Sequence, residues 1–124
     1  FEKHWTQTKT HVERLDKIFA ELGESGAGHT CQAMQGLVKE GEEVIEGQGH
    51  SSVKDAALIA AAQRVEHYEI AGYGTVRTYA KDLGKTEQAK LLQTTLDEEG
   101  ATDKALTGLA EGGMFRDGIN EEAE

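Results

Sequence analysis

Glu66 and Glu69 are the first residues in this sequence whose type and spacing could do chemistry. They lie in a stretch of about residues 52–83 in which apolar side chains recur at three- and four-residue steps, the period of one long helix. Side chains three residues apart share a helix face, and the apolar series of this helix passes over both glutamates. A buried carboxylate is costly unless it is protonated, paired with a cation or bound to a metal, so the pair indicates a buried site with one of these features.

Two further helical segments carry a polar residue on their apolar face. His11 falls in the apolar series of the first segment, and Glu99 falls in the leucine series of the last one. Helical bundles that bind two metal ions use carboxylates and imidazoles that project inward from facing helices. Carboxylate oxygens and imidazole nitrogens together suit iron or manganese. We therefore predict a two-ion site for iron, or for manganese, without assigning a catalytic residue; the predicted metal ligands are Glu66, Glu69, Glu99 and His11.

Each of these residues also has an ordinary structural interpretation. A glutamate on such a face can reach solvent or pair with an arginine, for which Arg64 and Arg77 are available. A single histidine on an apolar face is usually a hydrogen-bonded core residue. Four other residues are expected outside the set of ligands, His67 and Glu98 beside it or at the surface, and His4 and His50 at the surface.

The composition predicts that helices position these side chains. The chain has 124 residues, no proline, 37% hydrophobic and 29% charged residues, which favours one all-α domain. We expect helices at residues 1–22, about 30–45, about 52–83 and about 87–110, the second being a short crossover element. Gly23 and Gly84 are predicted helix ends. The predicted domain spans residues 1–112, and residues 113–124 form a polar, loose C-terminal tail.

Charge and hydropathy exclude some partners. The formal net charge is −10 and no basic stripe exists, which argues against binding nucleic acid or an anionic membrane. The longest apolar run, residues 56–62, is far shorter than the ~20 residues of a membrane span. Cys31 is the single cysteine, so a reducing compartment fits best and we expect a cytoplasmic protein. We expect Cys31 itself to be a small core residue.

Several segments of the sequence resemble the YciE/YciF family of bacterial proteins. They are VEHYEIAGYG at 65–74, DAALIAAAQ at 55–63, EGEEVI at 40–45, TLDEE at 95–99 with ATD at 101–103, and FEKH at 1–4 with QTK at 7–9 and HVERL at 11–15. The resemblance implies a ferritin-like helical bundle related to rubrerythrins, a link to stress responses, a homodimer and a di-metal site. The family's biochemical activity is not well defined, so whether this chain is an enzyme stays open.

The resemblance also implies roles for residues and shows departures. Glu66 and Glu69 fall at the E-x-x-E of a rubrerythrin helix, His11 at the histidine of an E-x-x-H, and Glu99 at the carboxylate of the last helix. Thr8 and Thr102 stand where the Glu partner of His11 and the His partner of Glu99 would be, and the family's first helix would precede this chain. We therefore expect a stress-associated protein with an incomplete di-metal site. The alternative is a non-catalytic structural or interaction protein, a metal-free dimer joined through the face that the absent helix leaves open.

Overall fold

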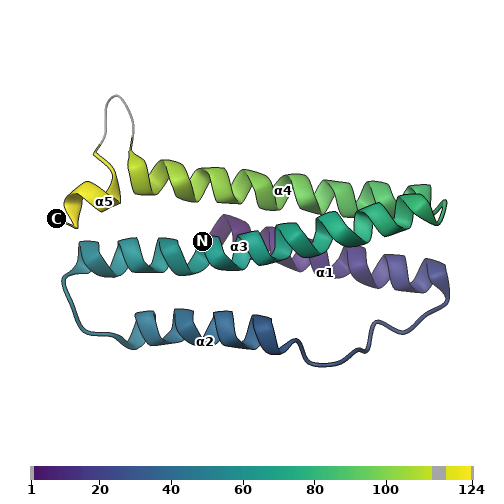
Figure 1. The fold of residues 1–124 in the computed structure, drawn as a ribbon, viewed down its shortest axis with the longest axis horizontal. Coiled ribbons are helices and arrows are strands. Elements are labelled where there is room, and N and C mark those ends of the chain that lie inside the picture. The colour runs from purple at the N-terminus through teal and green to yellow at the C-terminus, as the bar shows by residue number, and fades with distance from the viewer. Residues whose placement is uncertain (1, 113–116, 124) are drawn as a thin grey trace. The chain divides into compact units, whose positions relative to one another are not determined.

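In a computed structural model of the chain, which describes residues 2–112 and 117–123, the elements are all helical (Figure 1). No strand occurs among these residues, which confirms the all-α prediction, and the predicted bounds of the first four helices agree closely with the observed ones. Phe1, residues 113–116 and Glu124 lie outside the described residues, so the predicted tail is described only in part. The helices are α1 (Glu2–Leu22), α2 (Gln32–Glu46), α3 (Ser51–Asp82), α4 (Thr86–Glu111) and α5 (Ile119–Glu122).

Glycines in the left-handed conformation end two of the long helices. Gly23 has φ 71° after α1, and Gly84 has φ 70° after α3. The chain then turns back on the helix, as the backbone N–H of Glu24 donates to the carbonyl of Phe19 at 3.0 Å. Only glycine adopts this conformation without a steric penalty, which is why both ends were predictable from sequence.

The start of α2 differs from the sequence expectation. Cys31, expected in the core, is exposed and caps the helix, its Sγ accepting a hydrogen bond from the backbone N–H of Met34 at 3.5 Å. The Sγ atom also lies 3.0 Å from Oη of Tyr68. This hydrogen bond is the main cause that lowers the pKa of the Cys31 thiol and raises the pKa of Tyr68.

The contacts of the chain divide into two compact units that share α3 and α4. The first unit contains α1, the part of α3 from Glu69 onward and the part of α4 up to Glu99. Its apolar core holds Ile18, Ala89 and Leu92. Buried polar side chains of the same unit come from α1 and α4; they are His11, Thr95 and Glu99.

The second unit contains α2, α3 up to Tyr68, α4 from Gly100 and α5. Ile59, Ala61 and Leu106 are its buried apolar residues. The helix segments are also joined by a hydrogen bond from Nε2 of Gln63 to Oγ1 of Thr107 at 2.9 Å. Helix segments distant in sequence therefore pack together in each unit, as expected of helices with one apolar face.

Part of the predicted core-facing pattern is exposed instead. Tyr79 on α3 and Leu83, directly after that helix, are 61% and 75% exposed, and Trp5 on α1 is 62% exposed. Within the first unit no described segment covers these side chains, which explains why an apolar series on its own did not predict burial. None of the described helices combines the length and apolar character that a membrane span requires.

Candidate metal centre

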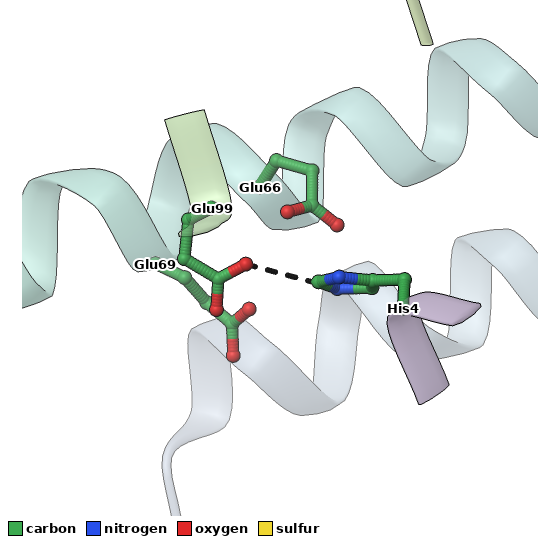
Figure 2. Close-up of side chains that lie close together, drawn as sticks. All are labelled: His4, Glu66, Glu69 and Glu99. Carbon is green, nitrogen blue, oxygen red and sulfur yellow. Dashed lines mark ion pairs between the residues drawn. The ribbon is translucent and has the colours of Figure 1, made fainter. Parts of the chain in front are cut away.

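Four side chains that can bind metal converge in the structure (Figure 2). They are His4 of α1, Glu66 and Glu69 of α3, and Glu99 of α4, and one ligand atom of each lies within 4.8 Å of the others. Glu66 and Glu99 are 3% and 0% exposed, and His4 and Glu69 are half-buried. Nε2 of His4 lies 3.7 Å from Oε2 of Glu99, the contact drawn as a dashed line in Figure 2.

Helix geometry accounts for the convergence of the carboxylates. Glu66 and Glu69 are one turn apart on the uninterrupted helix α3, so their side chains leave the same face. Glu99 comes from the adjacent part of α4 in the first unit. The resulting arrangement gathers acidic side chains in a poorly solvated place, where their charges are costly.

The pKa shifts around the cluster follow mainly from burial, with smaller contributions from the charges of neighbouring groups. Burial, the charge of Glu99 and a hydrogen bond to Glu99 raise the pKa of Glu69 to about 7. Burial and the charges of Glu69 and Glu99 raise the pKa of Tyr73 to about 12. Burial, with His11 nearby, lowers the pKa of His4. These directions disfavour further negative charge and keep His4 neutral, the form in which imidazole binds metal.

His11 lies behind the cluster rather than within it. The side chain is buried, and its two ring nitrogens face two consecutive glutamates of α4. Nδ1 lies 3.0 Å from Oε1 of Glu99, and Nε2 lies 2.9 Å from Oε2 of Glu98. Both nitrogens of the ring are therefore occupied by carboxylates.

Arg14 binds the carboxylate of Glu98, which contacts His11 on the side away from Glu99. Its Nη2 donates to Oε1 of Glu98 at 3.0 Å and its Nη1 donates to Oε2, so the pair is bidentate. The same Nη1 donates to Oγ1 of the buried Thr95 at 3.1 Å. The Arg14 guanidinium, helped by His11, keeps the pKa of Glu98 below its usual range.

The structure thus brings three predicted ligands together and places the fourth differently. Glu66, Glu69 and Glu99 share the cluster, whereas His11 contacts Glu99 and is not among the four clustered residues. His4, expected at the surface, takes part in the cluster instead. The missed signal is spacing, since His4 and His11 are seven residues apart and so lie on one face of α1, two turns apart.

The arginines considered as alternative partners make other contacts. Arg64 lies 3.6 Å from Glu40, and Arg77 donates to Oε1 of Gln93 at 2.8 Å. His67 is exposed and lies 2.9 Å from Oδ1 of Asp103. The remaining histidine of interest, His50, is exposed as expected.

The donor set of the cluster fits a divalent transition-metal ion. Three carboxylates and one imidazole, in a site of low exposure, match iron or manganese chemistry. Ligand atoms lie about 2 Å from such ions, so ligands on opposite sides of one ion are about 4 Å apart. The 4.8 Å spread of the four atoms is close to that value. The cluster can accommodate at least one ion, and a second ion stays a prediction.

Comparisons with known proteins agree with the resemblance noted in the sequence. The family model described as "Domain of unknown function (DUF892)" matches residues 1–123. Protein YciF of Escherichia coli (strain K12) is 50% identical over 111 residues, covering 89% of this chain and 67% of YciF.

Two solved structures share the fold. The crystal structure of the E. coli stress protein YciF matches with a TM-score of 0.84 and 50% identity, covering 88% of this chain and 69% of that chain. YcfI, "a putative structural protein from Rhodopseudomonas palustris", matches with a TM-score of 0.83 and 41% identity, over the same shares of the two chains. The helical-bundle fold and the YciF relationship are thereby confirmed, and this chain spans about two thirds of the length of these relatives.

Proposed function

This chain belongs to the DUF892 family, and we propose that it is a metal-binding, stress-associated protein of the YciF type. The proposed ligands of iron or manganese are His4, Glu66, Glu69 and Glu99. The observation that carries the proposal is the gathering of their ligand atoms within 4.8 Å of one another. Exposed acidic clusters are common on proteins, but here two of the carboxylates are buried.

Electrostatics supports a cation at this place. Three carboxylates in a poorly solvated site repel one another, and the raised pKa of Glu69 shows that a proton relieves part of this repulsion. A divalent ion would neutralise more charge than one proton and would gain ligand bonds from the same oxygens. The lowered pKa of His4 keeps its imidazole neutral at neutral pH, which suits a metal ligand.

The chain would supply binding, orientation and exclusion of water. Bound iron or manganese would supply redox chemistry with oxygen or peroxide, in keeping with the description of YciF as a stress protein. The two-ion form of the site belongs to this proposal. Its second ion would have few ligands here, because Thr8 and Thr102 occupy positions where the resemblance implies Glu and His.

Metal titration tests the proposal. Chelator-treated protein is titrated anaerobically with Fe²⁺ and separately with Mn²⁺ by calorimetry, and the bound metal is counted by elemental analysis. We expect one or two ions per chain for the wild type and none for a Glu66→Gln/Glu69→Gln variant. The matched control is Glu42→Gln/Glu43→Gln, which removes two exposed carboxylates of α2 and should bind like the wild type. Binding no tighter in the wild type than in the Glu66/Glu69 variant would refute the proposal.

A second candidate function is a structural or interaction protein that acts as a homodimer without metal. The exposed apolar side chains Trp5, Tyr79 and Leu83 favour it, as does the description of YcfI as a structural protein. A second copy would cover these side chains. We expect a Tyr79→Glu/Leu83→Glu variant to be monomeric by light scattering where the wild type is dimeric. A monomeric wild type at micromolar concentration would contradict the dimer.

We propose a cytoplasmic protein that does not bind nucleic acid. The single cysteine stays reduced there, and the net charge of −10 repels polyanions. Cell fractionation with a tagged chain tests the location. Recovery of the protein from the periplasm or outside the cell would contradict it.

A further inference from the structure

We propose that His11 is a positioning residue that holds the Glu99 carboxylate in place for metal binding, and that Glu98 and Arg14 hold His11 in turn. The inference rests on the metal-binding function proposed above. Spacing alone suggests that His11 is itself a metal ligand. In this proposal His11 instead contacts Glu99, and Glu99 binds the ion.

The two oxygens of Glu99 are divided between two histidines. Oε1 lies 3.0 Å from Nδ1 of His11, while Oε2 lies 3.7 Å from Nε2 of His4. The terminal torsion of a glutamate is broad, so a free carboxylate at this position would sample many orientations. The contact with His11 selects the orientation that points Oε2 toward His4 and the cluster (Figure 2).

The imidazole of His11 is itself fixed from the opposite side. Its Nε2 lies 2.9 Å from Oε2 of Glu98, and Arg14 donates hydrogen bonds to both oxygens of that carboxylate. His11 and Arg14 are three residues apart on α1, and Glu98 and Glu99 are consecutive on α4. Four side chains on two facing helix segments of one unit therefore form a continuous series of contacts that ends at Glu99.

Burial makes this series effective. His11 is 2% exposed, Glu99 is fully buried, and the Oγ1 atom of buried Thr95 receives a further hydrogen bond from Arg14. Polar contacts in such surroundings compete with little water and hold a definite geometry. Removing the partner of a metal-binding side chain typically weakens metal binding about 10–100-fold.

Manganese binding to His11→Leu and His11→Gln variants tests the inference. Chelator-treated wild type and variants are titrated with Mn²⁺, and pulsed EPR counts the imidazole nitrogens bound to the ion. We expect His11→Leu to bind Mn²⁺ about 10–100-fold more weakly with an unchanged number of bound imidazoles. His11→Gln, whose side-chain amide can donate a hydrogen bond to Glu99, should recover part of the affinity. His50→Gln, which alters an exposed histidine of the second unit, should match the wild type.

Other results would overturn either the positioning role of His11 or the proposed metal binding. Loss of one bound imidazole in His11→Leu would make His11 a ligand and overturn the positioning role. An unchanged affinity in both His11 variants would also overturn it. Wild type that binds no Mn²⁺ would refute the proposed function and this inference together. Should His11→Leu fail to fold by circular dichroism, His11→Gln and Arg14→Met decide in its place, and the inference fails if both bind like the wild type.

Discussion

The raised pKa of Glu69 predicts how the stability of the metal-free protein depends on pH. Burial and Glu99 raise this pKa from 4.5 to about 7, so the folded protein holds a proton that the unfolded chain releases. Stability therefore falls as the pH rises from the unfolded pKa through the folded one. At about 1.4 kcal/mol per pH unit, the loss attributable to Glu69 is at most about 3 kcal/mol, and partial exposure of the side chain reduces it.

Glu69→Gln removes the titrating group and keeps its shape. Urea unfolding of chelator-treated wild type and variant, followed by circular dichroism at about pH 5 and about pH 8, measures the effect through the free energy of unfolding. We expect the variant to become more stable relative to the wild type by up to about 2 kcal/mol as the pH rises from about 5 to about 8, because partial exposure of Glu69 reduces the full effect. Glu42→Gln, on the exposed face of α2, should keep the pH dependence of the wild type. Equal pH dependence in wild type and Glu69→Gln would refute the reasoning about burial and charge.

Further predictions concern the metal, the core and the backbone. Below about pH 7 the apparent affinity for Mn²⁺ should fall up to about tenfold per pH unit, because the metal competes with the proton on Glu69, and pH-independent calorimetric affinities would contradict this. Ile59→Ala should cost about 2–4 kcal/mol in urea unfolding because it empties a buried position, and a cost below about 1 kcal/mol would count against that packing. Gly84→Ala, at φ 70°, should destabilise by about 1 kcal/mol, whereas Gly36→Ala, inside α2 with open space around it, should stabilise by up to about 1 kcal/mol; changes of the same sign would be inconsistent with the backbone argument.

Local sequence rules predicted most of the fold. The three- and four-residue spacing of apolar residues predicted the long helix α3. Gly23 predicted the end of α1, and Gly84 predicted the end of α3. Burial of Glu66 and Glu99 also followed from spacing, because a polar residue in the middle of an apolar series turns inward with its neighbours.

The choice between His4 and His11 did not follow from spacing. Both residues occupy the same face of α1, so the helical period treats them alike. Which of them reaches the cluster depends on how far α1 is shifted along its own axis against α4. That shift is set by packing between residues distant in sequence, such as His11 against Glu98 and Glu99.

The spacing of apolar residues also did not predict which of them are exposed. Tyr79 and Leu83 continue the apolar series of α3, and the series shows only that this face is apolar. Whether a face is covered depends on what packs on it. The prediction that Cys31 lies in the core was wrong for a related reason. A small side chain at the start of a helix can cap the helix at the surface as well as fill a core.

Anomalous diffraction tests the central claim most directly. Crystals of the protein soaked in Mn²⁺ are measured at the manganese absorption edge, where an anomalous difference map locates the ion. We predict a peak within bonding distance of His4, Glu66, Glu69 and Glu99, with His11 in contact with Glu99 and not with the ion. A map without a peak among these four side chains, at a metal concentration that saturates binding in solution, would contradict the account.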